Sequence, residues 1–377
     1  MQIRDLEIKS ENGMTRAEAL VAWEDCGEPE KKVFIETPDE YADGFCLSAD
    51  AFLTGCIIPA LHFGEKRVTV EGEVCPGLLE GLDNVMELMR VWTGGGYQPL
   101  GIEPQKTAGR TRRAGQGHMR AGMFYSGGID SIAALRINMR NYPHSHPGRV
   151  RDCFFIHGFD IGGVPARGMK YHVFDRGLEA MENVASAAGV GTVPVYTNIR
   201  HLCDDRDLWL NRFFGAVLAA VGHGFSPRLD LFYIASSYDF ENLAPCGSHP
   251  MLDPEYSSFD LRIRHRDASF SRLDKIRVVA GWQPGMDNMR VCLANVEDRL
   301  NCGKCEKCVR TMTGLAALGV LDRAGAFVEN DVTPEMFEGF KINIRHREPF
   351  YIELLPLLEK QGRHDLAETI RNKLEEE

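Results

Sequence analysis

Residues 122–135, GMFYSGGIDSIAAL, run from an apolar strand through a tight turn into an apolar helix. Two adjacent glycines let the backbone adopt angles that are closed to other residues and approach a ligand closely. The start of the following helix points unpaired N–H groups and the positive end of its dipole toward the same place. Ser126 and Ser131 add hydroxyl donors, and Asp130 can cap the helix or help to hold Mg²⁺. The turn is therefore predicted to bind phosphate.

The sequence around this turn alternates between strand and helix patterns from residue 121 to about residue 245. Such alternation predicts a parallel sheet with right-handed crossovers. The expected strands are Met123–Tyr125, Cys153–His157, Val193–Tyr196 and Leu231–Ala235, and the expected helices are Ile132–Met139, Tyr171–Ala188 and Trp209–His223.

Four cysteines lie close together near residue 300, at Cys292, Cys302, Cys305 and Cys308. Their spacing, C-x9-C-x2-C-x2-C, allows four thiolates to close a tetrahedral shell around Zn²⁺. Four cysteines also hold iron–sulfur clusters, so the spacing leaves both centres open. A four-thiolate zinc site has no open coordination position, and we expect it to stabilise the fold.

The segments outside this central region are expected to form additional units. Residues 1–105 combine short strand patterns at 31–35 and 67–70 with helical patterns at Ala51–Phe63 and Leu78–Trp92. We therefore expect four parts: an α+β accessory domain at 1–105, a linker at 106–120, a central domain at 121–312 and a helical extension at 313–377, which ends in the amphipathic run Tyr351–Glu376. Three arginines of the linker, Arg110, Arg112 and Arg113, are alternatively expected to fold over a bound anion.

The composition of the chain limits the classes of molecule that it is expected to bind. The chain has 377 residues, 54 of them acidic and 43 of them Lys or Arg, and its formal net charge of −11 disfavours sequence-independent binding to nucleic acid. A small-molecule or protein partner fits better. The sequence shows neither a signal segment nor a run of about 18 apolar residues, which predicts a cytoplasmic protein outside the membrane. In such a chain, eleven cysteines indicate thiols or metal ligands.

The turn carries a resemblance to a known superfamily. Residues Ser126 to Ser131 match the Ser-Gly-Gly-x-Asp-Ser/Thr motif of the N-type ATP pyrophosphatases at every position, and they lack the Gly-Lys-Ser/Thr of a Walker loop. Together with the cysteine cluster, the loop makes the chain similar to the 7-cyano-7-deazaguanine synthases over residues 121–312. Residues 271–276, 290–292 and 301–310 extend this resemblance, whereas residues 236–254 echo the family's substrate loop only loosely.

The resemblance implies an α/β fold with a parallel, Rossmann-like sheet of the adenine nucleotide α-hydrolase type, helices on both faces and a zinc knuckle. It also implies an ATP-dependent ligase that uses Mg²⁺, in which a substrate carboxylate attacks the α phosphorus and releases pyrophosphate. Ammonia then displaces AMP to form an amide, which a second adenylation can dehydrate to a nitrile. The implied phosphate cradle is Ser126, Gly127, Gly128, Asp130 and Ser131, and the implied cationic catalytic residues are Lys275 and Arg310. Independently of the resemblance, the residues that follow the second expected strand lie where α/β sheets bind ligands, so we expect contact with adenine or ribose from His157, Gly158 and Asp160.

Two other classes of protein remain open. A tRNA-sulfur transferase needs a reactive cysteine outside the metal set, and Cys246, which follows the fourth expected strand, is the one well placed. A nucleotide-binding partner module in a modification or defence system would keep the loop and lose turnover. A protein partner and a homodimer are compatible with any of these hypotheses. His249 and His265 are the remaining polar candidates, and we expect both to be hydrogen-bonded loop residues.

Overall fold

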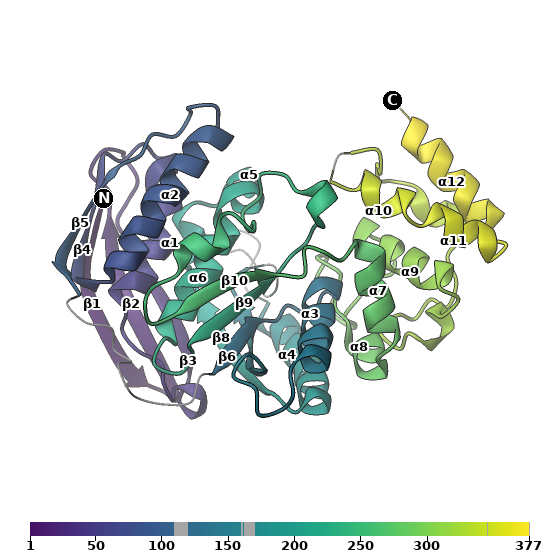
Figure 1. Cartoon of the computed structure of the whole chain (residues 1–377), viewed down its shortest axis with the longest axis horizontal. Coiled ribbons are helices and arrows are strands. Elements are labelled where there is room, and N and C mark those ends of the chain that lie inside the picture. Colours follow the sequence, from purple (N-terminus) through teal and green to yellow (C-terminus); the bar gives the residue numbers. More distant parts are fainter. Residues whose placement is uncertain (109–119, 160, 162–169, 345, 377) are drawn as a thin grey trace.

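The computed structural model describes residues 1–108, 120–159, 161, 170–344 and 346–376. These residues form one ten-stranded sheet with the strand order β10-β9-β6-β7-β8-β3-β2-β1-β4-β5 (Figure 1). Helices flank the sheet, so the predicted α/β class is confirmed. Arg110, Arg112, Arg113 and Asp160 lie outside the described residues, and the roles predicted for them stay predictions.

Five consecutive strands make the parallel part of the sheet. They are β6 (Ala121–Phe124), β7 (Val150–His157), β8 (Gly191–Thr197), β9 (Leu231–Ala235) and β10 (Arg262–Arg266). The chain moves outward from β6 through β7 to β8, returns to β9 on the other side of β6, and continues to β10. The strand order therefore reverses between β6 and β9. All four predicted strands are present, with bounds that differ by up to three residues.

The N-terminal segment continues the same sheet. Strands β1 (Gln2–Glu11), β2 (Met14–Ala22) and β3 (Lys31–Pro38) form an antiparallel meander, while β4 (Arg67–Val74) and β5 (Gly101–Thr107) add parallel strands beyond β1. Strand β3 pairs antiparallel with β8, opposing Ile35 to Thr197. The predicted division of the chain at residues 105 and 121 stays a prediction, but the two segments share one sheet.

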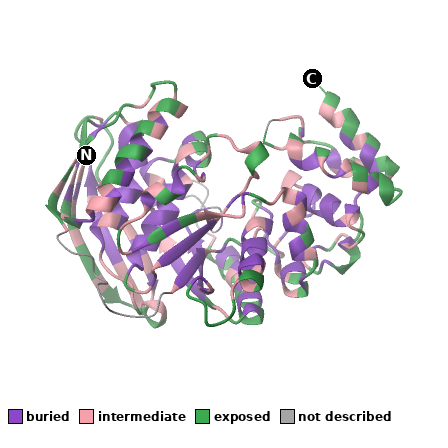
Figure 2. Cartoon of the chain, in the orientation of Figure 1, coloured by how far each residue is buried: buried purple, intermediate pink, exposed green. Residues whose placement is uncertain are grey.

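The two faces of the sheet are covered by different helices. Helices α1 (Ala49–His62), α2 (Pro76–Trp92) and α6 (Phe214–Gly224) pack on one face, and α3 (Ile129–Asn141) and α4 (Tyr171–Ala188) pack on the other. Strand β7 contributes Phe154 to the first core and Phe155 to the second, as expected for alternating side chains of a fully buried strand. Figure 2 shows the buried residues concentrated on the sheet and on the inner sides of these helices.

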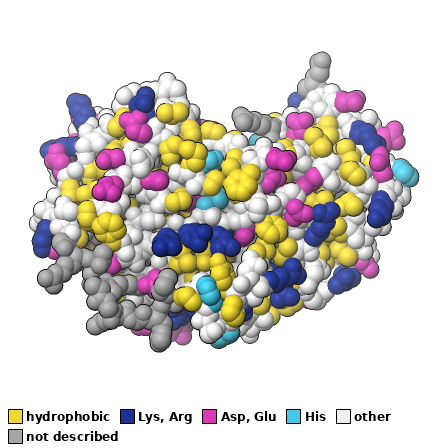
Figure 3. Space-filling view, viewed as in Figure 1, with side chains coloured by type: hydrophobic (Ala, Val, Ile, Leu, Met, Phe, Trp, Pro, Cys, Tyr) yellow, Lys and Arg dark blue, Asp and Glu magenta, His cyan; other side chains and the backbone are white. Residues whose placement is uncertain are grey.

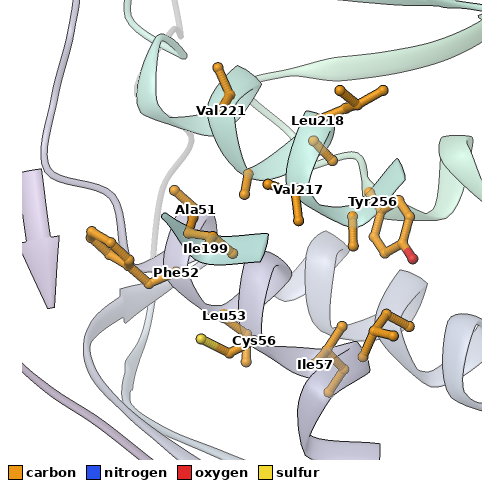
Figure 4. Packing of buried hydrophobic residues seen from close by; sticks show 14 of the residues in the cluster. Ala51, Phe52, Leu53, Cys56, Ile57, Ile199, Val217, Leu218, Val221 and Tyr256 are labelled. Carbon is orange, nitrogen blue, oxygen red and sulfur yellow. The ribbon is translucent and has the colours of Figure 1, made fainter. Parts of the chain in front are cut away.

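Helix α1 shows how closely the N-terminal and central segments are joined. It is apolar on nearly all sides because it lies between the sheet and α6. Phe52, Cys56 and Ile57 of α1 and Val217 and Leu218 of α6 belong to one buried cluster (Figure 4). The residues before 105 and those after 121 therefore bury one common apolar core.

The C-terminal part is helical and lies at the opposite end of the molecule from β1 (Figure 1). It contains α7 (Arg272–Ala280), α8 (Gln283–Asn288), α9 (Glu306–Ala317), α10 (Glu348–Ile352), α11 (Leu355–Lys360) and α12 (His364–Glu375). The amphipathic run Tyr351–Glu376 is helical, and it is divided among the end of α10, α11 and α12. Gly362, at φ +73°, separates α11 from α12, because a left-handed glycine ends a helix.

The other elements are short. The predicted helix Trp209–His223 begins instead with α5 (Arg206–Leu208) and one π-helical turn, Trp209–Phe213, before α6. Single 3₁₀ turns are η1 (Asp39–Tyr41), η3 (Ile199–Leu202), η5 (Phe240–Asn242), η6 (Asp253–Tyr256), η7 (Leu321–Arg323) and η8 (Pro334–Phe337). Within the described ranges, none of the helices combines the length and the apolar character that a membrane span requires.

Candidate functional site

The glycine turn connects β6 to α3, as the sequence predicts. Gly127 has φ +76°, and a Cβ atom added there would lie 2.6 Å from the Met181 sulfur. Its carbonyl accepts a hydrogen bond of 2.7 Å from the backbone N–H of Arg290. The fold itself therefore favours glycine at position 127, since the backbone is left-handed and a side chain would also displace Met181.

Gly128 differs from its neighbour. It is the N-cap residue of α3 and has an extended backbone, φ −74° and ψ 164°, which any residue adopts. The nearest atoms to an added Cβ are Ser126 Oγ at 3.4 Å and the Arg290 carbonyl oxygen at 3.9 Å. Among the described residues, no side chain caps α3. The fold thus leaves room for a side chain at 128, on the rim of an uncapped helix N-terminus.

The two serines of the turn interact with its own backbone. Ser131 Oγ donates to the Gly128 carbonyl at 3.0 Å, and Ser126 Oγ lies 3.4 Å from both Ser131 Oγ and the Gly128 nitrogen. Ser131 and Gly127 are buried, Gly128 is half-buried and Ser126 is exposed. The backbone at 128 and the Ser126 hydroxyl are therefore the parts of the turn that a ligand can reach.

The turn lies at the carboxyl edge of the sheet, where the strand order reverses between β6 and β9. Open α/β sheets bind ligands at such a switch point. From the neighbouring strand, the carbonyl of Ser236, directly after β9, accepts a hydrogen bond of 2.7 Å from Lys275 Nζ. The predicted loop residues and Lys275 are thus brought together at one edge.

A cluster of cations surrounds Asp130. Arg272 Nη1 lies 3.0 Å from Asp130 Oδ2, and Lys275 Nζ lies 3.5 Å from Asp130 Oδ1. The Lys275 side chain is 1% exposed; burial lowers its pKa, and Asp130 opposes that shift. Asp130 does not cap α3, because the N-cap position is held by Gly128. Its carboxylate instead pairs with two cations.

Arg310 joins this cluster from α9. Burial lowers the pKa of Arg310, and Arg272 lowers it further. Arg310 Nη1 lies 3.3 Å from Glu306 Oε1, and the guanidinium groups of Arg310 and Arg272 lie 4.7 Å and 5.0 Å from the ring centre of Phe350. Arg310 therefore has both an acidic neighbour and a place beside the loop. Sequence reasoning missed Arg272, although it opens a helix with a capping box formed by Ser271 and Asp274.

The four predicted cysteines form a compact cluster that could hold a metal ion. Their sulfur atoms all lie within 4.8 Å of one another, and three measured separations are 3.5, 3.8 and 3.9 Å. Zn–S bonds of about 2.3 Å in a tetrahedron place sulfur atoms about 3.8 Å apart. The backbone N–H of Cys305 donates to Cys302 Sγ at 3.3 Å, and Gly303 between them has φ +74°. The residues therefore fit a zinc ion.

One further residue, Asn301, holds the backbone around the cysteine cluster in place. Its side-chain oxygen accepts hydrogen bonds from the Val291 and Cys292 N–H groups at 2.9 and 3.2 Å. Its nitrogen donates to the carbonyls of Met289 and Ala326, both at 2.9 Å. Asn301 is 2% exposed, so these four bonds stay shielded from water. Sequence reasoning missed this role, because an asparagine beside a cysteine gives no signal of which backbone groups it meets.

Asn301→Ala is expected to lower the free energy of unfolding by about 2–4 kcal/mol, because it leaves two buried N–H groups and two carbonyls without the hydrogen-bond partner that Asn301 provides. Denaturant unfolding and the rate of metal transfer to a chromophoric chelator measure the effect. Asn183→Ala is the control, because Asn183 is exposed and donates one bond of 3.3 Å to Asn288. Equal unfolding midpoints for the two variants would contradict the role of Asn301.

The segment that carries Cys292 contacts the glycine turn directly. Arg290 donates its N–H to Gly127 and precedes Cys292 by two residues. The backbone that presents the first cysteine therefore also supports the turn. Distortion of the cysteine cluster is expected to reach Gly127 through this contact.

The residues predicted to contact adenine or ribose lie after β7. His157 is 2% exposed and stacks on Tyr171, with ring centres 4.8 Å apart and an interplanar angle of 7°. Gly158 has φ +103°, and an added Cβ would lie 2.0 Å from the Thr197 carbonyl oxygen. Packing against α4 therefore accounts for His157, and close packing against β8 accounts for Gly158. Their contact with a nucleotide stays a prediction.

Cys246 and His249 lie in the segment after β9. The Cys246 thiol donates to the Leu210 carbonyl at 3.5 Å, and burial raises its pKa, which disfavours the nucleophilic thiolate. His249 packs edge-on against Trp92, with ring centres 5.1 Å apart, and burial lowers its pKa. Neither environment is that of an activated group.

The surface near this edge carries a row of basic side chains over β9 and β10 (Figure 3). Strand β10 is the edge strand and presents exposed arginines at positions 262 and 264. Charged side chains on an edge strand oppose pairing with another sheet.

Comparisons of the chain with protein-family models, curated proteins and solved structures found no match.

Proposed function

We propose that the chain is an ATP-dependent ligase that forms AMP and pyrophosphate, similar to 7-cyano-7-deazaguanine synthase. In this proposal, the parallel strands form a Rossmann-like sheet of the adenine nucleotide α-hydrolase type. A substrate carboxylate attacks the α phosphorus of ATP to give an acyl adenylate. Ammonia then displaces AMP and forms an amide, from which a second adenylation can yield a nitrile.

The observation that carries the proposal is the pair of glycines at the N-terminus of α3. The fold accounts for Gly127 through its φ of +76°, but it leaves space for a side chain at the half-buried Gly128. Close approach of a phosphate to the backbone explains a glycine there. The strand reversal between β6 and β9 and the match to the pyrophosphatase motif support the same assignment.

In the proposed site, the backbone of Gly127 and Gly128 and the Ser126 hydroxyl hold the β and γ phosphates. Arg272 and Lys275 lie alongside, where they would neutralise charge on the leaving pyrophosphate. Both carboxylate oxygens of Asp130 already face these cations. We therefore propose that Mg²⁺ is held by the phosphates of ATP, whose charge it offsets, and takes no ligand from Asp130.

The cysteine cluster is proposed to hold structural zinc. Four thiolates leave no coordination position for a substrate, so the ion would fix the segment that supports the turn. An iron–sulfur cluster is the competing occupant. Metal analysis and the visible absorbance of the purified chain distinguish the two, because zinc thiolates are colourless.

The purified chain is expected to convert MgATP to AMP and pyrophosphate when it is given 7-carboxy-7-deazaguanine and ammonium chloride. Thin-layer chromatography of α-labelled ATP and pyrophosphate detection measure the products. Release of ADP and phosphate would contradict the proposal. Tight binding of ATP without AMP formation, for this acid and a panel of other carboxylates, would favour a nucleotide-binding partner module.

Cys246→Ser separates the ligase from a tRNA-sulfur transferase. The ligase reaction is expected to proceed at an unchanged rate, since the Cys246 thiol is protonated and bonded to Leu210. A sulfur transferase would lose turnover. The comparison measures AMP formation by the wild type and by Cys246→Ser.

A further inference from the structure

A buried histidine–carboxylate pair connects β10 to the segment after β9 and has no part in the chemistry described so far. His265 Nδ1 lies 2.8 Å from Asp253 Oδ2. The same oxygen accepts the Ser248 hydroxyl at 2.6 Å, and Asp253 Oδ1 accepts the His249 N–H at 3.2 Å. The Asp253 side chain is fully buried and the His265 side chain is 3% exposed. Asp253 is thus held from three directions.

This arrangement fixes the tautomer of His265. An ionised carboxylate only accepts hydrogen bonds, so Nδ1 must carry the hydrogen that faces Asp253. In the neutral ring, Nε2 then carries the lone pair and can accept a proton. Among the described residues, the buried Nε2 atom has no hydrogen-bond partner. A buried polar atom in this state calls for an explanation, because nearly all such atoms are paired.

The backbone beside the pair is hydrogen-bonded to the segment that holds Lys275. His265 is the next-to-last residue of β10, and the carbonyl of the last residue, Arg266, accepts the Ser236 N–H at 2.8 Å. The Ser236 carbonyl in turn accepts Lys275 Nζ. Asp267 lies within electrostatic reach of both Lys275 and His265. Charged groups therefore continue from Asp130 at the turn to His265 at the end of β10.

We propose that His265 Nε2 accepts the proton released by the nitrogen nucleophile in the second half of the ligase reaction, and that Asp253 positions it; this inference rests on the proposed function. The ammonia lone pair forms a bond to the carbonyl carbon of the acyl adenylate. The bond from that carbon to the phosphate oxygen breaks, and AMP leaves with the electron pair. One N–H proton passes to His265 Nε2, leaving a neutral amide. No oxidant or reductant is required.

A purely structural pair would fasten the segment around Ser248 to β10 and do nothing else. His265→Asn separates the two roles, because the asparagine amide can still donate to Asp253 from near the Nδ1 position but has no atom at Nε2. This substitution therefore preserves a structural role of His265 but removes its proton-accepting atom.

The experiment measures the two half-reactions separately, with MgATP and 7-carboxy-7-deazaguanine as probes. ATP–pyrophosphate exchange, which reports adenylation alone, is expected to be unchanged in His265→Asn. Amide formation with ammonium chloride is expected to fall by about 100-fold or more, the usual contribution of a positioned general base. Hydroxylamine, which is unprotonated at neutral pH and a stronger nucleophile, is expected to restore product formation as the hydroxamate.

His249→Asn is the matched control. His249 is a neighbouring buried histidine whose Nδ1 accepts the Met251 N–H at 3.1 Å, a bond that an asparagine oxygen can replace. It is expected to keep both half-reactions. Equal amide formation by wild type and His265→Asn would overturn the assignment of His265 while leaving the ligase intact. Loss of exchange in His265→Asn would also overturn it, whereas absence of exchange in the wild type would refute the proposed function itself.

Discussion

Cys308→Ser is expected to release the zinc ion and to lower the free energy of unfolding by more than about 3 kcal/mol. Four-ligand zinc sites contribute about 10–16 kcal/mol to the folding of small domains, and loss of the ion removes much of that contribution. Cys308 is fully buried at the start of α9, so the remaining thiolates would lack a counter-charge in a shielded place. The cluster is therefore expected to fail as a unit.

The same variant is expected to weaken ATP binding, although no cysteine belongs to the proposed phosphate cradle. Arg290 connects the two places, because its N–H supports the Gly127 carbonyl and its chain leads to Cys292. Once the first cysteine is released, this support loses its anchor. ATP affinity should then fall together with zinc content.

Three measurements test this account: metal analysis for stoichiometry, calorimetry for the melting temperature, and titration with MgATP for affinity. Cys26→Ser is the control, since it makes the same atomic change in a partly exposed cysteine outside the cluster. It should keep one zinc ion per chain and bind ATP normally. A Cys308→Ser chain that retains full zinc and an unchanged melting temperature would contradict the metal assignment.

The sequence predicts those parts of the fold that short-range patterns encode. The strand, turn and helix around residues 122–135 follow from neighbouring residues alone, and the cysteine cluster follows from spacing over 17 positions. The pairing of β3 with β8 does not, because its partners, Ile35 and Thr197, are far apart in the chain. From the sequence alone, the N-terminal segment is therefore predicted to be a separate unit, although it shares the sheet and the core with the central segment.

The same limit applies to the candidate site. Lys275 and Arg310 could be named because they stand within motifs, and both lie beside the loop. Phe350, which lies against Arg272 and Arg310, comes from the helical extension, far along the chain from the glycine turn. Only tertiary structure brings such residues together. The helical extension therefore contributes a residue to the candidate site. The sequence does not predict this contribution.

Gly128→Asp is expected to make the chain slightly more stable and to abolish ATP binding. Aspartate is a favoured N-cap residue, and its charge complements the helix dipole, so α3 should gain about 0.3–1 kcal/mol. The backbone at 128 is extended and the nearest atom to a new Cβ lies 3.4 Å away, so the fold accepts the side chain. A carboxylate in the cradle would meet the phosphates as a like charge, which costs several kcal/mol and reduces affinity by about 100-fold or more.

The opposite signs of these two effects make the test specific for the anion pocket. General damage would lower stability and affinity together, whereas an ordinary strand-to-helix turn would gain stability with no loss of nucleotide. Gly27→Asp is the matched control, because Gly27 is exposed and an added Cβ there meets no atom within 4 Å. It should leave MgATP titrations unchanged. If Gly128→Asp binds MgATP as tightly as Gly27→Asp does, the uncapped N-terminus of α3 is not a phosphate site, and the ligase proposal loses the observation that carries it.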